Sequence, residues 1–410
     1  MSDISQPRPQ LMMVIRGLLG AGGGAERIFC EMAGMLTAEG YCVTCLHFDN
    51  KMGLVHFPLD PAVQLRNLYP PLFSKIGLLS RAMTLAAKIP LLKERLSSRF
   101  HWLARNMAFL DALTAQLSSE RPDVLISFLP PANTPALLAG ARTAVPVIVT
   151  NHNVPAHDYD STERWDQNPL DRRLRSKALY KAAAIHVLFP RFGDWFSPNL
   201  QKRIVAIPNY VSPHVWPDHV EEKREKIILG VGRLSGVKNY GDLLEAWSQI
   251  APKFPDWRVV IFGKGRKRGG LERRAAKFGL ESSFILGGQT NQIAVEYSRA
   301  SIFCHPALHE GFGLSVVEAM AHELPTVAFD DCSGVNEFVT DEVNGLLPPR
   351  LGGSSALAIS LARLIEDDAL RARLGAAARR TAFQFSERKF VEHWKALIDE
   401  IRDRQKRGKT

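Results

Sequence analysis

The sequence predicts an α/β protein of two domains, each built on a parallel sheet with helical crossovers. The chain has 410 residues, which exceeds what one hydrophobic core usually supports and favours two domains of roughly 200 residues each. Short apolar runs alternate with segments of helical period along most of this length, which is typical of repeated strand–helix–strand units. The composition, 46% hydrophobic and 23% charged, is that of an ordinary globular protein.

The elements can be placed in order from these runs. In the first half we expect a helix over residues 25–39 and strands at residues 11–15, 42–48, 124–129, 147–150, 184–189 and 204–207. In the second half we expect strands at residues 226–231, 258–262, 284–286 and 302–304, with helices that begin near residues 240, 270, 291 and 314. A last helix is expected over residues 386–401, and the basic residues 402–409 are predicted to be disordered.

Bulk properties limit the function classes. Lys and Arg number 52 against 42 Asp and Glu, a net charge of +10 that favours anionic partners. The five cysteines form no paired spacing and most lie in apolar runs, which indicates reduced core thiols in a cytosolic protein. Residues 1–10 are polar and Pro-rich, unlike a secretory signal, and prolines interrupt the longest apolar region, residues 124–149, so no membrane span is expected.

The stretch 304–324 carries the clearest chemistry. A buried strand is followed by a turn with Gly311 and Gly313, and a helix then begins near Leu314. Free N–H groups and the positive end of the helix dipole make this turn a natural seat for phosphate. Glu310 and Glu318 flank it. Eight residues on a helix would separate them by about 80° around the axis, so we expect them to hold one ligand at two points rather than to share a proton.

The spacing of Glu310 and Glu318 resembles the E-x7-E signature of retaining GT-B glycosyltransferases of family 4. Four further segments are similar to that family in order and spacing: 228–234 with Lys238, 297–300, 334–337 and 344–347. The resemblance implies two Rossmann-like domains that face a central cleft. It implies an acceptor-binding domain over residues 1–210, a nucleotide-sugar domain over residues 211–385, and a helix in residues 386–410 that crosses back to the first domain.

The resemblance also implies the site residues. Catalytic roles fall to Glu310, His152, Arg233 and Lys238. Donor binding falls to Gly23, Gly24, Arg233, Lys238, Glu310, Gly311, Phe312, Gly313, Leu314 and Glu318. His152 follows a predicted strand at the end where open α/β sheets place ligands. We expect no metal and no cofactor, because Arg233, Lys238 and the helix N-terminus supply the positive charge.

The activity that the resemblance implies is transfer, with retention, of a hexose or N-acetylhexosamine from a nucleotide diphosphate sugar, with UDP expected at the level of the family. The acceptor would be a lipid-linked glycan or a lipopolysaccharide or exopolysaccharide precursor, and no nucleic acid is expected. The sequence departs from the family pattern at Tyr210, Lys264, Arg266, Ala307 and Glu323. The nucleotide base, sugar, acceptor, linkage and oligomeric state stay open.

Two alternatives remain. Residues 20–25 match G-x-G-x-x-A, and Asp49 ends the next strand near the spacing of a dinucleotide site, which is typical of an NAD-dependent oxidoreductase. The same loop is similar to the family's G-G-A-E-R segment at Gly23 and Gly24, where the backbone approaches the donor phosphates. A relative that binds sugar nucleotides without catalysis is the other alternative.

Residues 75–105 carry seven cations and one acid among leucines, Phe100 and Trp102. Two amphipathic helices joined at Pro90 fit this pattern, and a basic face beside an apolar one suits an anionic membrane surface. We therefore expect a cytoplasmic protein held at the inner face of the cell membrane. The alternative is a solvated face over the domain core.

Overall fold

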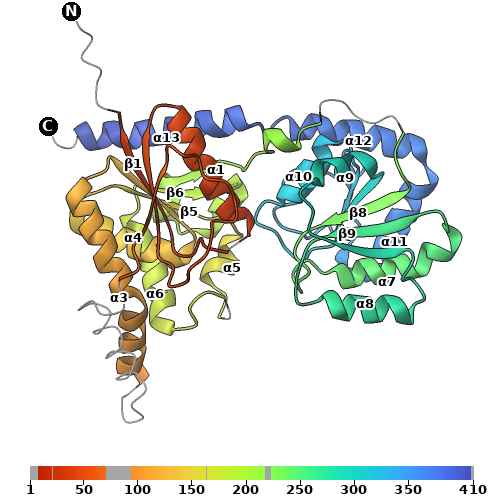
Figure 1. Cartoon of the computed structure of the whole chain (residues 1–410), viewed down its shortest axis with the longest axis horizontal. Helices are drawn as coiled ribbons and strands as arrows, with labels where there is room; N and C mark the ends of the chain where they lie inside the picture. The colour runs from red at the N-terminus through yellow and green to blue at the C-terminus, as the bar shows by residue number, and fades with distance from the viewer. Residues whose placement is uncertain (1–7, 21, 71–93, 163, 218–222, 408–410) are drawn as a thin grey trace, which may run out of the picture. The chain divides into compact units, whose positions relative to one another are not determined.

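The computed structural model describes residues 8–20, 22–70, 94–162, 164–217 and 223–407. The chain forms two compact units, Met1–Ile207 with Val391–Thr410, and Pro208–Phe390. Each unit has its own sheet and its own helical layers (Figure 1).

The first unit is built on a seven-stranded sheet in the order β3-β2-β1-β4-β5-β6-β7. Every pair of neighbouring strands is parallel. The strands are β1 (Gln10–Ile15), β2 (Cys42–His47), β3 (Gln64–Asn67), β4 (Val124–Phe128), β5 (Val147–Thr150), β6 (Ala184–Val187) and β7 (Ile204–Ala206). The central strands are almost wholly buried, which fits their continuous apolar sequence and a sheet covered on both faces.

Helices cover both faces of this first sheet. One layer contains α3, α4 and α6, and the opposite layer contains α1 and α13 (Figure 1). The helices of this unit are α1 (Gly24–Ala38), α3 (Glu94–Glu120), α4 (Pro130–Thr143), α5 (Pro155–Tyr159), α6 (Pro169–Ala178) and α13 (Glu387–Arg407). The C-terminal part of α13 is joined to this unit by Tyr41, whose hydroxyl donates a 3.1 Å hydrogen bond to Asp399 Oδ1.

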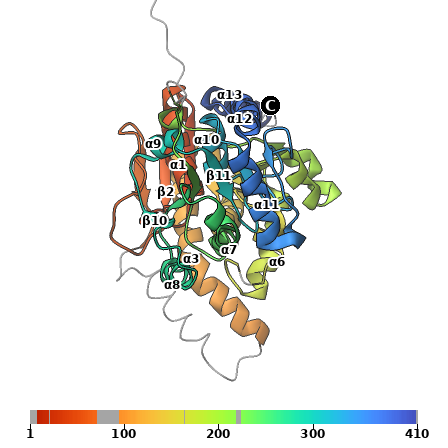
Figure 2. The same ribbon diagram turned by 90° about the vertical axis from the view of Figure 1, so that its right-hand side faces the viewer.

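The second unit repeats the plan with a six-stranded parallel sheet in the order β10-β9-β8-β11-β12-β13. Its strands are β8 (Ile227–Val231), β9 (Arg258–Phe262), β10 (Phe284–Gly288), β11 (Ile302–His305), β12 (Thr326–Ala328) and β13 (Gly345–Leu346). Its helices are α7 (Tyr240–Ile250), α8 (Arg268–Lys277), α9 (Ile293–Arg299), α10 (Leu314–Ala321), α11 (Gly353–Glu366) and α12 (Asp368–Ala382). Figure 2 shows α7, α8 and α11 along one side of this sheet.

The strand order reverses once in each sheet. In the first sheet β1 lies between β2 and β4, and in the second β8 lies between β9 and β11. Open α/β sheets bind ligands outside the carboxyl ends of the strands at such a switch point. In the second sheet a ligand is therefore expected at the loops that follow Val231 and His305, the last residues of β8 and β11.

The strands expected from the sequence are all present, with ends shifted by at most two residues. Three strands were missed. β3 is an edge strand of largely exposed residues, and β12 and β13 have only three and two residues, so none carries an apolar run long enough to identify it.

The predicted disorder of residues 402–409 is wrong for most of that segment. Helix α13 continues to Arg407. Arg402 supports this last part, because its guanidinium lies 3.0 Å from Asp399 Oδ1 and 3.8 Å from Asp123 Oδ1.

The predicted helix pair joined at Pro90 lies mainly outside the described residues. The described end of that region belongs to one long helix, α3 (Glu94–Glu120). Among the described residues, none of the helices combines the length and the apolar character that a membrane crossing needs.

Candidate active site

An ion pair between Lys238 and Glu310 marks the switch point of the second sheet. Lys238 lies in the loop that follows β8, and Glu310 lies in the loop that follows β11. The Lys238 ammonium donates a hydrogen bond to Glu310 Oε1. His305, the last residue of β11, places Nε2 at 3.1 Å from the same oxygen. Two cationic or hydrogen-bonding groups thus converge on one carboxylate.

This environment fixes the charge of Glu310. Burial alone would raise the pKa of its carboxyl group, but the Lys238 ammonium and the His305 hydrogen bond outweigh burial and hold that pKa well below its usual range. The pKa of His305 is lowered, first by burial and then by the Lys238 charge. Near neutral pH the Glu310 carboxyl group is therefore ionised, and a neutral His305 donates its Nε2–H to it.

The turn after Glu310 requires glycine. Gly313 has φ +86° and caps the N-terminus of α10, a conformation that costs a side chain free energy. Gly334 supports the turn from outside, because a Cβ there would stand 2.6 Å from the Glu310 carbonyl oxygen and 2.7 Å from that of Gly311. The first N–H groups of α10, at Leu314 and Ser315, are therefore presented at a turn that no side chain at these glycines obstructs.

Phe312 contributes to this turn through its backbone. Its side chain is 3% exposed, and its ring packs at 5.5 Å from Phe338 and 5.3 Å from Phe385. The resemblance placed Phe312 among the donor-binding residues. The structure places its ring in the core of the second unit.

Glu318 lies further along α10 and is 5% exposed. Its Oε2 accepts a 3.0 Å hydrogen bond from the hydroxyl of Tyr297, which belongs to α9. A charged group is costly to bury unless it is hydrogen-bonded. Tyr297 therefore helps to hold this carboxylate at its place on the helix.

Arg233 lies on a platform formed by two loops. Leu234 N–H donates to Lys264 O at 2.9 Å, and Lys267 N–H donates to Leu234 O at 3.1 Å. A Cβ on Gly265 would stand 2.1 Å from Leu234 O, so the loops after β8 and β9 can approach this closely only with glycine there. Arg233 and Lys264 are both exposed on this platform, as is Arg266. The departure from the family pattern at residues 264 and 266 therefore adds positive charge beside Arg233.

His152 follows β5 in the first unit. Its ring stacks on Phe128 with centroids 4.9 Å apart, and the side chain is 8% exposed. Both ring nitrogens are buried without a hydrogen-bond partner among the described residues. Burial, with His186 adding to it, lowers the pKa of His152 well below its ordinary value. His152 is therefore a neutral imidazole with two unused polar atoms at the carboxyl end of the sheet.

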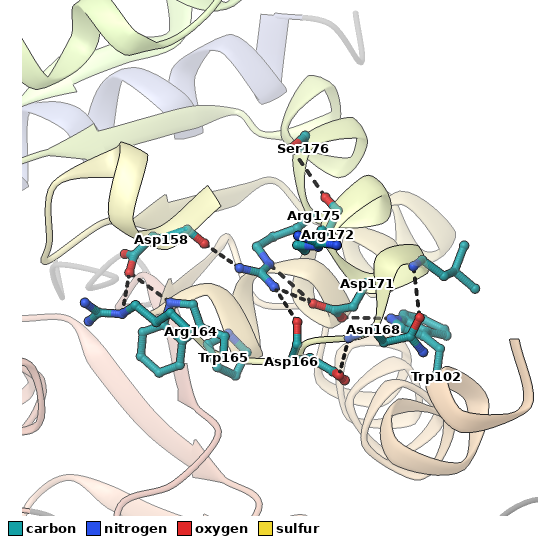
Figure 3. Close-up of polar contacts among 12 residues, drawn as sticks. Trp102, Asp158, Arg164, Trp165, Asp166, Asn168, Asp171, Arg172, Arg175 and Ser176 are labelled. Atoms are coloured by element: carbon teal, nitrogen blue, oxygen red, sulfur yellow. Dashed lines mark hydrogen bonds and ion pairs between the residues drawn. The ribbon is translucent and has the colours of Figure 1, made fainter. Parts of the chain in front are cut away.

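A buried network braces the segment that follows His152 (Figure 3). The carboxylate of Asp158 accepts a 2.8 Å hydrogen bond from Trp165 Nε1 and lies 3.1 Å from Arg164 Nε. Arg175, only 2% exposed, donates to the Asp158 carbonyl oxygen and pairs at 2.8 Å with Asp171. This network was not predicted from the sequence. The closely spaced Asp and Arg residues from 158 to 175 were the available signal.

Trp102 joins the same network. It is buried, and its Nε1 donates a 2.9 Å hydrogen bond to Asp171 Oδ1. Trp102 is therefore not part of an apolar face that could contact a membrane, and at this residue the structure fits the alternative, a helix face over the domain core. The indole instead fastens α3 to α6 within the first unit.

The glycine loop of the first unit leads into α1. Gly23 caps the helix, and Gly24 is its first residue. Asp49, which a dinucleotide site would use for the ribose, is engaged locally. Its Oδ2 accepts a 2.8 Å hydrogen bond from Leu18 N–H and contacts His47 Nδ1 at 2.9 Å. The feature that suggested an NAD site thus has a structural role in the turn after β1.

Both units match protein families. Residues 216–381 match the family described as Glycosyl transferases group 1, and residues 23–210 match the Glycosyl transferase 4-like domain. Together the two matches include every predicted site residue, His152, Gly23 and Gly24 in the first unit and the rest in the second.

Individual proteins that resemble this chain are also glycosyltransferases. An uncharacterized glycosyltransferase of Haemophilus influenzae is 31% identical over 194 residues, 47% of this chain and 54% of the relative. The chain thus spans about half of that protein. The amylovoran biosynthesis glycosyltransferase AmsD of Erwinia amylovora is 21% identical over 95% of this chain and 99% of its own. A Campylobacter jejuni N-acetyl-D-galactosaminyltransferase, whose name gives an undecaprenol diphosphate glycan as its substrate, is 24% identical over 75% of this chain and 83% of its own.

Solved structures show the same fold. TarM superimposes with a TM-score of 0.74 at 16% identity, over 96% of this chain and 99% of its own. Anabaena HepE, solved in complex with UDP and glucose, gives a TM-score of 0.71 at 17% identity, over 96% of this chain and 100% of its own. At these identities the likeness concerns the two-sheet architecture.

Proposed function

The chain belongs to the GT-B glycosyltransferases of the family-4 type, and we propose that it transfers a sugar from a nucleotide diphosphate donor to a glycan precursor. The observation that carries this proposal is the Lys238–Glu310 pair beside the glycine turn and the N-terminus of α10. A cation, an anion and free N–H groups at one switch point match the parts of a sugar nucleotide.

Each part of the donor has a chemically suited partner in the second unit. The diphosphate suits Lys238, Arg233 and the N-terminus of α10. The sugar hydroxyls suit the Glu310 carboxylate, which accepts hydrogen bonds, and the ribose hydroxyls suit Glu318. The donor would give Lys238 and Glu310 new charged or polar partners, so neither group would be left buried and unpaired.

We propose retention at the anomeric carbon by departure and attack on the same face of the sugar. A double-displacement route needs a carboxylate nucleophile and an acid/base carboxyl about 5 Å apart across the bond. Glu310 is engaged by Lys238 and His305, which suits holding the sugar rather than attacking it. Arg233 and Lys238 would stabilise the charge that develops on the leaving diphosphate. Because these cations supply the charge, activity is expected to survive EDTA, and loss that Mn²⁺ restores would contradict this.

The acceptor is proposed from the relatives. The Campylobacter enzyme is named for a lipid-diphosphate-linked glycan, and AmsD for an exopolysaccharide. We therefore propose a lipid-linked or polysaccharide precursor as the acceptor of this chain, and a hexose or N-acetylhexosamine as the transferred sugar. UDP is the proposed nucleotide because HepE was solved with it.

Such an acceptor favours a location at the inner face of the cell membrane. The cations of residues 75–105 remain candidates for contact with anionic lipid, and two of them, Arg99 and Arg105, are exposed on α3. Co-sedimentation with anionic liposomes at low salt tests this, with Arg81, Lys88, Arg95 and Arg99 changed together to Glu. Equal pelleting of both proteins, or no pelleting of either, would contradict membrane contact.

The experiment that tests the function is a thermal-shift panel of UDP, GDP, ADP and NAD with their sugar conjugates, followed by turnover of the sugar nucleotide that stabilises most. A glycosyltransferase should be stabilised by one nucleoside diphosphate and its sugar and should release the nucleotide. Stabilisation by NAD alone would revive the oxidoreductase alternative. Nucleotide binding without turnover, with the acceptors named above supplied, would indicate a relative that has lost catalysis.

A further inference from the structure

Tyr240 has a buried hydroxyl without a partner. It is the first residue of α7 and only 2% exposed. Its hydroxyl oxygen makes no hydrogen bond to any described residue. Burying an unpaired hydroxyl is unfavourable, whereas Phe would fill the same space without that penalty. The hydroxyl therefore destabilises the fold as described, and its presence calls for a partner.

The hydroxyl lies at the carboxyl end of β8, next to the side chain of Lys238. A Cβ on Gly232 would stand 3.0 Å from the Tyr240 hydroxyl oxygen and 3.1 Å from Lys238 Cε. The two groups therefore flank the same point above Gly232. Gly230 makes room in the same way, since a Cβ there would stand 3.0 Å from Tyr240 Cε1. A side chain at either glycine would crowd the tyrosine ring or the lysine chain over the strand end.

The residue between them explains why both side chains face this point. Asn239 has φ +51°, the left-handed conformation, and forms the N-cap of α7. Its amide donates a 2.7 Å hydrogen bond to Asp242, which fixes the turn. Asn tolerates this conformation better than most residues. Lys238 and Tyr240 thus flank a fixed turn at the start of α7.

The Lys238 ammonium has hydrogen-bonding capacity left. It has three N–H donors, and Glu310 is the acceptor that it uses among the described residues. A lysine is a flexible point charge, so its direction depends on what fixes it. A second fixed acceptor beside Cε would leave one N–H to point at a ligand.

We propose that Tyr240 is a positioning residue for Lys238 in the donor-bound state. The ammonium makes no hydrogen bond to the Tyr240 hydroxyl in the structure as described; with the donor bound it turns to donate one N–H to that hydroxyl, one to Glu310 and the third to the diphosphate. The inference rests on the proposed function, because it needs a diphosphate at Lys238. The proposal gives the buried Tyr240 hydroxyl a hydrogen-bond partner, the Lys238 ammonium. Tyr240 would not touch the reacting atoms and would act through the direction of the lysine.

The test is a double-mutant cycle with Tyr240→Phe, Lys238→Met and the double variant. Binding of UDP and of inorganic pyrophosphate is measured by calorimetry, turnover with the sugar nucleotide is measured, and each Tm is recorded. For Tyr240→Phe we expect a Tm equal to or above that of the natural protein, with a three- to tenfold loss in affinity for both probes. In the Lys238→Met background the same change should have no further effect.

Tyr41→Phe is the matched control. Its hydroxyl has a partner, Asp399, and it lies in the first unit, so its loss should lower the Tm and leave pyrophosphate affinity unchanged. Tyr240→Phe with a lowered Tm and full affinity would overturn the proposal, as would equal effects in both lysine backgrounds. If the natural protein binds neither UDP nor pyrophosphate, the proposed function fails and the role of Tyr240 fails with it. If the natural protein and Tyr240→Phe bind both probes equally well, the positioning role of Tyr240 fails and the proposed function stands.

Discussion

The Tyr297 hydroxyl donates a 3.0 Å hydrogen bond to Glu318 Oε2, and both side chains are buried between α9 and α10. The bond joins the two helices that precede and follow β11 in the chain. A carboxylate held in this way loses little freedom when a ligand binds to it. Preorganisation of Glu318 is therefore a property of the fold.

Glu318→Ala should weaken nucleotide binding, because the ribose hydroxyls would lose their acceptor, at a cost of about 1–3 kcal/mol. Tyr297→Phe keeps the carboxylate and removes one hydrogen bond that holds it, so a smaller loss is expected. Calorimetry with UDP checks both variants. Unchanged affinity in Glu318→Ala would remove this residue from the site, and a larger loss for Tyr297→Phe than for Glu318→Ala would reverse the proposed order.

Arg233→Ala should lower kcat more than it raises KM. Arg233 is exposed on the platform after β8, where its charge matters most as the diphosphate leaves. A loss of about tenfold in kcat corresponds to roughly 1.4 kcal/mol of transition-state stabilisation. Lys277→Ala, an exposed cation at the far end of α8, is the control and should change neither constant. A raised KM with a normal kcat would instead show that Arg233 stabilises the bound substrate and the transition state equally.

The sequence predicted both sheets and most of the strands because their apolar runs are local signals. It also placed Glu310 and Lys238 at strand ends. Their direct pairing could not be predicted, since 72 residues separate them in the chain and only the tertiary fold brings the loops together. The state of Tyr240 could not be predicted either, although it is only two residues from Lys238, because the burial of its hydroxyl without a hydrogen-bond partner among the described residues depends on the folded chain.

Long-range contacts also bury residues whose burial could not be predicted from the sequence. A tryptophan among cations resembles a membrane anchor, but Trp102 hydrogen-bonds Asp171, 69 residues away. Arginine is usually a surface residue, yet Arg175 is buried in the network around Asp158. Single-residue hydrophobicity carries no information on such partners.

Stability should fall on acidification from pH 7 to pH 5. Burial lowers the pKa of His186 and of His322 to about 4 from 6.5. Between these values the unfolded chain binds protons that the folded chain does not, so stability rises with pH across this window. Each histidine should cost about 1–2 kcal/mol at pH 5.

Denaturant titrations at several pH values measure this slope. His152 should add to it because its pKa is also lowered by burial, whereas Asp158 opposes it because burial raises its pKa. His101, exposed on α3, supplies the control: His101→Gln should keep the slope of the natural protein. Equal stability at pH 7 and pH 5 would show that the buried histidines do not govern it.

Glu323→Gly should stabilise the protein. Glu323 follows the C-terminus of α10 with φ +58°, the left-handed position that commonly ends a helix and that glycine occupies without strain. The Glu323 side chain contributes little stability to offset this strain, because its contact with Arg379 is a partly exposed 3.8 Å ion pair. The backbone of Glu323 has little room to move, because Gly375 packs closely against it. A Cβ on Gly375 would stand 2.2 Å from the Glu323 carbonyl oxygen.

We expect a gain of about 0.5–1 kcal/mol for Glu323→Gly, less than the full relief of strain because glycine also loosens the unfolded chain. Glu323→Ala separates the two contributions, since it removes the ion pair and keeps the left-handed strain. The expected order of unfolding free energy is Gly above Glu, with Ala at or below Glu. If the glycine variant were no more stable than the alanine variant, the conformation of residue 323 would not be strained.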